Sequence, residues 1–365
     1  MARTLADRAS DAFREALGDL GFEPADGIDA VRFGRRAAQL AAAESAWQDV
    51  LGPTLSAREV AELLGVTRQA VHDRVKRRRL IRLRARDGHG VFPLFQFDRG
   101  TPPADALLAA HAIVAAQADG WTAAAFLVRP QPELGGCSPV AWLRANPDAD
   151  PEPVPARGTP RRLRSRGIAP VPLGQPPADL SRFPEYLLPA RRPLYRVYRP
   201  DRGSPWWFSG SGGGRFDLLD GVHGTCYVAA ARIGAVVETL GRLAAISEED
   251  ANTRSVAVLA CGRALRIADL TNRRALGFRV TAEIHSTPDY VLPQTWAAAL
   301  HARGFEGLRY RLSHDPSARL TGYALFDQTD DAASRWPPPV SSAGPALGDV
   351  ARLARDFGVR VIPRP

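Results

Sequence analysis

The stretch between Leu194 and Glu238 decides the fold of this chain, and it contains LYRVYRP at 194–200, GGGRF at 212–216, GTCYVA at 224–229 and GAVVE at 234–238. The segment LYRVY alternates apolar residues with Arg196, which predicts a strand that presents this arginine on one face. A second predicted strand over residues 225–229 carries Tyr227, and a helix of small residues then leads to Glu238. The pattern predicts a strand, a glycine-rich loop, a second strand and a helix.

The residue types in this stretch suggest a site for a dinucleotide. The glycines before Arg215 leave the backbone free to approach a ligand closely. Arginine presents a planar fork of donors that matches phosphate oxygens, so Arg196 and Arg215 suit a diphosphate. The ring of Tyr227 can stack on a flat base, and Glu238 can stabilise positive charge on a sugar carbon. Together these groups indicate NAD, although an ordinary core whose arginines form surface ion pairs explains the same pattern.

The motifs, in this order, resemble those of the RES domain, a family of NAD-degrading bacterial toxins. The matching residues are Arg196, Arg215, Tyr227, Glu238 and, within GFEGLRYRLSHDP at 304–316, Ser313. The resemblance covers about residues 193–327 and implies an α+β fold of the ADP-ribosyltransferase-like type. One departure is that Phe216 and Asp217 follow the loop arginine, where the family often has tryptophan and asparagine.

The resemblance also implies roles for these residues. Arg196 and Arg215 would hold the diphosphate of NAD+, and Tyr227 would stack on nicotinamide or the adjacent ribose. Glu238 would stabilise the transition state, and Ser313 would position the substrate or Glu238. Ser313 could instead be a turn residue that caps the following HDPS. NAD+ is thus expected as a substrate, and no cofactor is expected.

Composition limits the class of protein. The chain has 365 residues, 45% of them hydrophobic and 24% charged, which is ordinary for a globular protein of several domains. No apolar run is long enough to cross a membrane, and the charged N-terminus is unlike a signal peptide. The three cysteines and seven histidines show no metal-ligand spacing. We therefore expect a cytoplasmic protein without metal, in which His223, His285 and His314 form local hydrogen bonds.

A helix-turn-helix is predicted within residues 54–100. Ser56 and Glu59 form a capping box before VAELLG, Gly65 makes the turn, and TRQAVHDRVKRRR follows as the second helix. The next segment, LIRLRARDGHGVFPLF, predicts a two-stranded wing around Asp87 and Gly88. This arrangement is typical of a DNA-binding domain.

Nearly all of the net charge of +9 lies in this region, because residues 66–86 carry eight arginines and Lys76 against Asp73 alone, a local net charge of +8. We expect the start of the second helix to read base edges through Thr67, Arg68, Gln69 and His72. Phosphates would be contacted by Lys76, Arg77, Arg78, Arg82 and Arg84. A solvated basic helix on a protein-interaction module is the alternative, but the motif together with the charge favours DNA.

A second resemblance concerns the segments VFPLFQFD at 91–98, WTAAAFLVRP at 121–130 and LGGCSPVAWLRANPD at 134–148. In this order they resemble the toxin-binding domain of the antitoxins that are encoded beside RES toxins, and the match covers about residues 29–147. The resemblance implies a fused toxin–antitoxin chain. The first half would then cover the cleft of the second, within one chain or across a dimer.

The predicted organisation is multidomain, with an all-α first half that contains a winged helix-turn-helix and an α+β second half. Its segments are a helical region (1–53), the helix-turn-helix (54–100), a helical toxin-binding domain (101–150), a linker (151–190), the RES catalytic domain (191–330) and a tail (331–365). The linker is inferred from ten prolines, which disfavour helix and sheet. The tail, with a short amphipathic helix over 346–359, has no assigned role.

The predicted function is cleavage of NAD+ at the nicotinamide–ribose bond, by hydrolysis or phosphorolysis. The first half would bind DNA and restrain the toxin. One alternative is an ADP-ribosyltransferase that modifies a macromolecule, and another is a DNA-binding regulator whose second half senses a nucleotide without turnover. The fate of the ADP-ribose group distinguishes the three.

Overall fold

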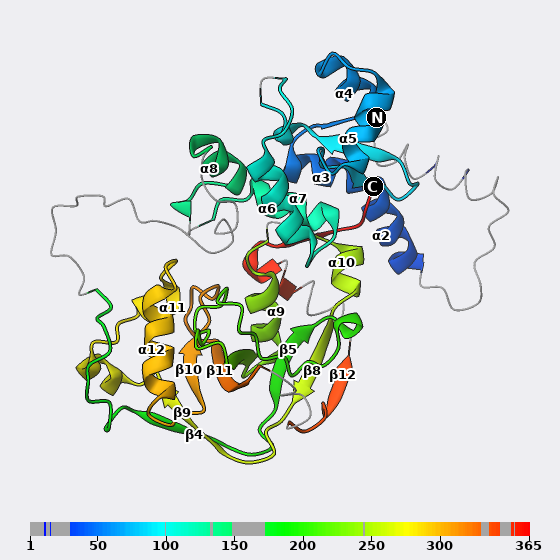
Figure 1. The fold of residues 1–365 in the computed structure, drawn as a ribbon. Helices are drawn as coiled ribbons and strands as arrows, with labels where there is room; N and C mark the ends of the chain where they lie inside the picture. The colour runs from blue at the N-terminus through cyan, green and yellow to red at the C-terminus, as the bar shows by residue number, and fades with distance from the viewer. Residues whose placement is uncertain are drawn as a thin grey trace, which may run out of the picture.

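The computed structural model describes residues 11, 15, 30–98, 100–131, 134–147, 172–243, 245–329, 336–343, 352–353 and 355–365. Figure 1 shows an upper lobe of helices, residues 30–147, above a lower lobe built on a sheet, residues 172–343. The C-terminal segment, drawn in red, runs from the lower lobe back to the upper one. The helices predicted before residue 30 lie almost wholly outside the described residues.

Helix α7 forms the centre of the upper lobe. Its residues from Trp121 to Leu127 are all buried, as expected for a helix that is apolar on every side. The side chain of Asp119 caps it by accepting a hydrogen bond from the Thr122 amide at 2.8 Å. The described helices of this lobe are α2 (Ala30–Ala41), α3 (Ala43–Leu51), α4 (Ala57–Leu63), α5 (Arg68–Lys76), α6 (Asp105–Ala115), α7 (Gly120–Val128) and α8 (Pro139–Ala145).

The expected capping box is present before α4. The Ser56 hydroxyl accepts from the Glu59 amide, and the Glu59 carboxylate accepts from the Ser56 amide. After α5, a hairpin forms as predicted and is extended to a three-stranded sheet with the order β1–β3–β2. These strands are β1 (Thr54–Leu55), β2 (Leu83–Arg84) and β3 (Gly90–Pro93).

The lower lobe contains a mixed sheet of eight strands in the order β12–β8–β5–β6–β11–β10–β9–β4. The strands are β4 (Glu185–Leu188), β5 (Leu194–Tyr198), β6 (His223–Ala229), β8 (Ser255–Leu259), β9 (Leu265–Asp269), β10 (Gly307–Arg311), β11 (Thr321–Gln328) and β12 (Ser341–Ala343). The helices are α9 (Arg232–Leu240), α10 (Glu248–Asn252), α11 (Glu283–Ser286) and α12 (Val291–His301). The strand–loop–strand–helix unit predicted from the sequence is thus present as β5, the glycine loop, β6 and α9.

The sheet opens between β5 and β6. These two strands pair at one position, Tyr195 opposite Ala229, whereas β11 pairs with β6 along its whole length. Beyond that point the segment after β5 takes over, since Ser209 forms an isolated bridge with Thr225. The opening leaves room for side chains between the strands.

The predicted linker, 151–190, extends too far toward the C-terminus. Residues 148–171 lie outside the described residues, but from residue 172 onward the chain packs on the lower lobe. Leu173, Leu180 and Phe183 are buried there, and β4 pairs with β9 at the edge of the sheet. Prolines are tolerated at this edge because an edge strand leaves half of its backbone donors unpaired.

The tail predicted at 331–365 is also part of the fold. Within it, β12 adds to the sheet by pairing with β8. A further strand, β13 (Arg360–Ile362), pairs in parallel with β7 (Ala245–Ser247). The predicted end of the catalytic domain at residue 330 is therefore too early.

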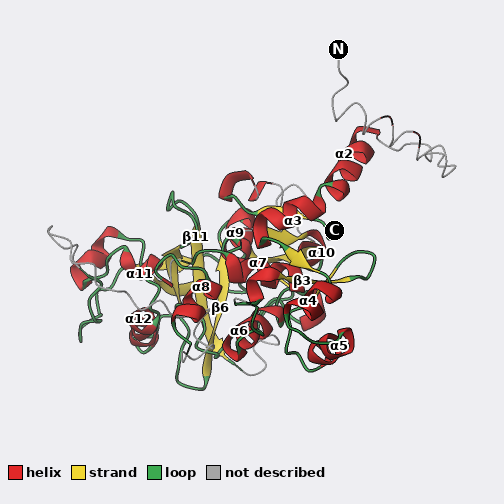
Figure 2. Cartoon of the chain, turned by 90° about the horizontal axis from the view of Figure 1, so that it is seen from above, coloured by secondary structure: helices red, strands yellow, loops and turns green. Residues whose placement is uncertain are grey.

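One hydrophobic core crosses both lobes. It contains Trp47 of α3 and Trp121 of α7 from the upper lobe, together with Val236 of α9 and Ile246 of β7 from the lower lobe. Figure 2, which views the chain from above, shows α3 and α7 beside α9 and α10. The C-terminal residue Ile362 belongs to the same core. The two lobes are therefore one packed body within a single chain.

Among the described residues, no helix combines the length and apolar character needed to cross a membrane.

Candidate functional site

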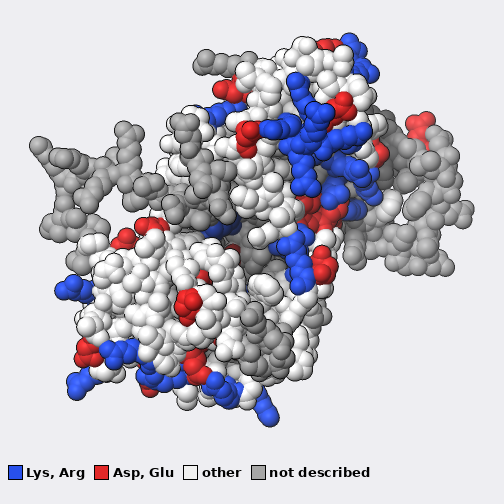
Figure 3. Space-filling view, in the orientation of Figure 1, with Lys and Arg blue, Asp and Glu red and all other residues white. Residues whose placement is uncertain are grey.

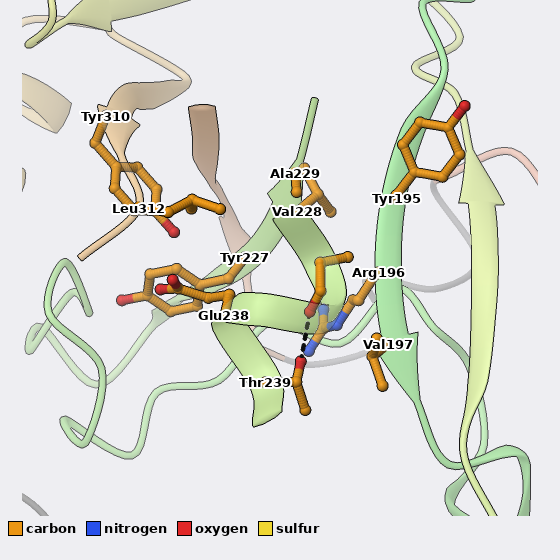
Figure 4. A pocket seen from close by; sticks show the side chains of 11 residues that line it. Tyr195, Arg196, Val197, Tyr227, Val228, Ala229, Glu238, Thr239, Tyr310 and Leu312 are labelled. Carbon is orange, nitrogen blue, oxygen red and sulfur yellow. Dashed lines mark hydrogen bonds between the residues drawn. The ribbon is translucent and has the colours of Figure 1, made fainter. Parts of the chain in front are cut away.

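A cavity of about 140 Å³ lies at the opening between β5 and β6, next to α9. Its wall contains Arg196, Tyr227 and Glu238, so the structure brings three of the predicted site residues together (Figure 4). They come from β5, β6 and α9, and β10 adds Tyr310 to the wall. We call this space the glutamate cavity.

Glu238 is the acidic residue of this wall. Its Oε2 is buried and has no hydrogen-bond partner among the described residues, while Tyr310 contributes a hydrogen bond to the carboxyl group. Burial raises the pKa of Glu238, and the positive charges of Arg242 and Arg215 oppose that rise. One carboxylate oxygen therefore remains available inside a site that is largely removed from water.

Arg215 is buried, but it is not one of the residues that line the glutamate cavity. Its guanidinium donates to the Thr287 carbonyl and lies 4.7 Å from the centre of the Tyr290 ring. Burial lowers the pKa of Arg215, and the nearby Glu238 partly offsets this effect. In this arrangement Arg215 supplies positive charge beside Glu238 rather than a free donor in the cavity wall.

The glycine loop is fastened to Tyr227. The Tyr227 hydroxyl donates to Asp217 Oδ1 at 2.8 Å and accepts from the Phe216 amide at 2.8 Å. A Cβ on Gly214 would lie 2.3 Å from Asp217 Oδ1 and 2.5 Å from this hydroxyl, so the position requires glycine. From α12, Gln294 Nε2 donates to the Gly212 and Gly214 carbonyls at 2.8 and 2.9 Å. These bonds fix the ring of Tyr227 in the cavity wall.

Asp217 and Tyr227 occupy a dry environment. Burial raises the pKa of both groups, and the negative charge of Asp217 raises the pKa of Tyr227 further. The phenol therefore keeps its proton and remains a hydrogen-bond donor to Asp217. The predicted departure from the family at position 217 thus has a structural role in this chain.

Arg196 reaches across the opening of the sheet. Its Nη1 donates to the Trp207 carbonyl at 2.9 Å and lies 2.6 Å from Cys226 Sγ. Arg196 also lines a second cavity of about 510 Å³, together with Val197 and Thr239. Because the two cavities share these residues, they adjoin each other. We call the larger one the junction cavity, since Gln117 of the upper lobe belongs to its wall.

Ser313 is not brought into the glutamate cavity. Its neighbour Leu312 lines that space, whereas Ser313 itself lies in a turn after β10 and is half-buried. The next residue, His314, accepts a hydrogen bond at its Nε2 from Arg242 Nε at 3.0 Å. Burial and the charges of Arg242, Arg215 and Arg129 lower the pKa of His314 to about 3, so this imidazole is neutral.

The upper lobe contacts the lower lobe beside the two cavities. Arg129, at the end of α7, donates to the Leu243 carbonyl just after α9. Ser247 Oγ donates to Asp119, and the Ser247 amide donates to Thr122 Oγ1 at 3.0 Å. The caps of α7 and α10 are therefore joined to each other.

The residues predicted to contact DNA lie on one exposed face. Figure 3 shows lysine and arginine gathered over α5 and the adjoining hairpin. All of the predicted contact residues are exposed: Thr67, Arg68, Gln69, His72, Lys76, Arg77, Arg78, Arg82 and Arg84. Thr67 has a local role as well, because its hydroxyl caps α5 by accepting from the Ala70 amide.

One group among the described residues has the composition of a metal site. Asp220, His223 and His301 each offer a ligand atom within 4.8 Å of the others. In the structure these residues contact one another directly: His223 Nδ1 lies 2.6 Å from Asp220 Oδ2, and the two imidazole rings meet at 4.6 Å. His223 thus forms a local hydrogen bond, as expected from the sequence.

The comparisons with known proteins concern the lower lobe. The family model of the RES domain matches residues 193–348, a stretch that includes β12. Among solved structures, a match is the crystal structure of the M. tuberculosis MbcT–MbcA toxin–antitoxin complex. It is 15% identical with a TM-score of 0.33, and the match covers 43% of this chain and 85% of that one. A search of curated proteins finds no match.

Three residues of the site were not predicted from the sequence: Asp217, Arg242 and Tyr310. Arg242 follows Glu238 by four positions, and this spacing could have indicated it, because such residues are neighbours on a helix. Tyr310 lies in β10, and only the pairing of β10 with β11 brings it to Glu238. Asp217 gave no signal beyond its departure from the family pattern.

Proposed function

We propose that the RES domain of this chain cleaves NAD+ at the bond between nicotinamide and ribose. The observation that carries the proposal is the glutamate cavity, where the unpartnered Oε2 of Glu238 shares a wall with Arg196 and Tyr227. A carboxylate that is removed from water stabilises a developing cation more strongly than a solvated one does. RES toxins act on NAD, which agrees with this chemistry.

The bond that breaks joins C1′ of ribose to the nicotinamide nitrogen. The bonding electron pair leaves with nicotinamide, which becomes neutral, and the sugar carbon develops the positive charge of an oxocarbenium ion. Glu238 faces that charge, and Tyr227 supplies a rigid ring for the flat base or the ribose. Water or inorganic phosphate then attacks C1′, which gives ADP-ribose or its 1-phosphate together with a released proton when water is the acceptor.

Volume decides how NAD+ would be placed. Ligand pockets for drug-sized molecules have volumes of about 300–1,000 Å³, whereas the glutamate cavity has about 140 Å³. The glutamate cavity therefore accommodates the nicotinamide end alone, and the rest of the dinucleotide would extend toward the junction cavity past Arg196. In this placement Arg196 contacts the diphosphate. Arg215 contributes indirectly, because its positive charge lies beside Glu238. Ser313 would assist only through a movement of its turn.

We further propose that the upper lobe restrains this activity and binds DNA. Arg129 of the upper lobe donates a hydrogen bond to the Leu243 carbonyl, and Gln117 of the same lobe forms part of the wall of the junction cavity. In this proposal α4, α5 and the hairpin act as a winged helix-turn-helix, whose exposed basic face would contact the DNA backbone. This face lies on the front of the upper lobe in the view of Figure 3 and is open there, so the docked chain can still contact DNA.

The test is release of nicotinamide by the full chain and by Arg129→Gln, each with and without Glu238→Gln. We expect Arg129→Gln to raise the rate and Glu238→Gln to abolish it in both backgrounds. NAD+ labelled on adenine identifies the product: free ADP-ribose or its phosphate supports the proposal, and a labelled macromolecule indicates a transferase instead. If every variant binds NAD+ measurably but leaves it intact, the proposed cleavage is wrong and the chain is a nucleotide sensor instead.

A further inference from the structure

The junction cavity concentrates positive charge between the lobes. Its wall contains four arginines, Arg196, Arg199, Arg202 and Arg254, and it has a volume of about 510 Å³. The acidic partner among them is the buried Asp250, which pairs with Arg199 and, at 3.2 Å, with Arg254. Among the described residues, one carboxylate pairs with this group of four guanidinium groups, which leaves an excess of positive charge in a partly enclosed space.

Part of this hydrogen-bonding capacity is unused. The Nε atoms of Arg199 and Arg254 are buried without a partner among the described residues. Buried charged donors are normally paired, because an unmade hydrogen bond to a charged group is costly. Because these donors are unpartnered, the positive charge behind the cavity wall is only partly compensated, and this favours an anion in the cavity.

The upper lobe meets two of these arginines with backbone carbonyls. Arg202 donates to the Ala116 carbonyl, and Arg254 Nη2 donates to the Gln117 carbonyl at 3.0 Å. Both carbonyls lie at the C-terminal end of α6, where helix carbonyls lack intrahelical partners and the helix dipole is negative. The carbonyl oxygens at the end of α6 therefore occupy positions where an anion could bind these arginines. They carry only partial negative charges.

We propose that the junction cavity is a binding site for a phosphate-bearing anion, and that this anion competes with the C-terminal carbonyls of α6 for Arg202 and Arg254. A phosphate group carries full negative charges and matches the guanidinium fork, so it is a stronger acceptor than two carbonyls. Its binding would free the end of α6 and weaken the contact between the lobes. The site would thus link the anion level to restraint of the RES domain.

Two sources supply this chemistry, inorganic phosphate and the diphosphate of an adenine nucleotide. Trp207 lines the same cavity and is 63% exposed, so an adenine ring could stack on it. Inorganic phosphate uses the arginines alone. This inference rests on the proposed placement of the NAD+ diphosphate toward the junction cavity, but binding of either anion requires no cleavage of NAD+, so anion binding and nicotinamide release can fail separately.

The experiment measures binding of inorganic phosphate and of ADP-ribose to the full chain by calorimetry. Arg202→Gln is the test variant, because Arg202 is exposed and its loss leaves the buried Asp250 pairs in place. Arg303→Gln is the matched control, since Arg303 is also an exposed arginine that donates to a carbonyl, that of Ala178 at 2.6 Å, away from the junction. We expect about tenfold weaker binding in Arg202→Gln and unchanged binding in Arg303→Gln.

Amide hydrogen exchange tests the competition with α6. In the wild-type chain, saturating anion should speed exchange of the Gln117 and Ala118 amides, which bond to the Val114 carbonyl at the helix end. Arg202→Gln should show fast exchange before anion is added. Tighter binding of ADP-ribose than of phosphate in the wild type but not in Trp207→Ala identifies the nucleotide as the source. Absence of saturable binding, equal affinities in the two arginine variants, or exchange that ignores the anion would overturn the proposal.

Discussion

The two lobes present their candidate functional residues in opposite ways. On α5 and the hairpin, the predicted DNA contacts are exposed and follow one another within 18 positions, from residue 67 to residue 84. In the glutamate cavity, Arg196, Tyr227 and Glu238 come from three separate elements and are fixed by buried neighbours. The exposed face depends on its own charges, whereas the cavity depends on residues that never touch its interior. Substitutions should therefore have graded effects on the first and abrupt effects on the second.

The largest expected effect is at Glu238. Glu238→Gln keeps the shape of the side chain but removes the negative charge that stabilises the oxocarbenium ion. Nicotinamide release should therefore fall by about 100-fold or more. Glu185→Gln is the control, because Glu185 is an exposed glutamate of β4 that pairs with Arg266. Equal rates in the two variants would remove Glu238 from the mechanism.

A smaller but still abrupt effect is expected at Gly214. Gly214→Ala places a methyl group against the Asp217–Tyr227 hydrogen bond, and relieving such a clash costs about 1–3 kcal/mol of unfolding free energy. Nicotinamide release should fall as well, because the Tyr227 ring shifts. In Gly213→Ala, the new Cβ would meet only Ser211 Oγ at 3.5 Å. If this control loses as much activity as Gly214→Ala, the hydrogen bonds between the glycine loop and Tyr227 are not required for activity.

On the exposed face the effects should be graded. The double variant Lys76→Ala/Arg77→Ala removes two phosphate contacts, so DNA affinity should weaken several-fold and the salt dependence of log K should become shallower by about 2. Arg58→Ala serves as a control, since Arg58 lies on α4 and pairs with Glu62 at 2.8 Å. Fluorescence anisotropy at several salt concentrations measures both quantities. An unchanged salt slope in the double variant would contradict a DNA-binding role for α5.

The smallest effect concerns acid stability. Burial lowers the pKa of His111 on α6 to about 4, from an ordinary value near 6.5, so folding favours the neutral imidazole. Its contribution to stability is complete above pH 6.5 and is lost as the pH falls from 6.5 to 4. In His111→Gln, the melting temperature should therefore fall less over this pH range than in the wild type. The expected difference is a few degrees, which corresponds to about 1 kcal/mol of unfolding free energy. His72→Gln, on the exposed face, should leave the decline unchanged.

The comparison also explains which features the sequence could predict. Local patterns were sufficient for β5, β6 and α9, because alternation and helix periodicity depend on neighbouring residues. The exposed basic face was predicted for the same reason, since its residues are close in sequence. The linker and tail were misjudged because the strands β4, β12 and β13 are short and are formed by pairing with distant partners.

The candidate site was predicted only in part. Arg196, Tyr227 and Glu238 were identified and share a cavity, but Arg215 and Ser313 do not line it. The difference between a wall residue and a buried neighbour depends on side-chain direction in the folded chain, which spacing alone does not fix. The contact of Arg202 and Arg254 with α6 has no sequence signal, because its acceptors are backbone carbonyls.

The strand β13 has a consequence for the order of events during protein synthesis. The Pro363 carbonyl accepts a hydrogen bond from Trp47 Nε1 at 2.9 Å, and Arg364 reaches Asp119 at 3.0 Å. A ribosome adds these residues after the rest of the lower lobe. The upper lobe is translated first, but its contacts with the C-terminal segment can form only when translation is nearly complete. A chain that ends before β13 would therefore lack both of these contacts between the C-terminal segment and the upper lobe.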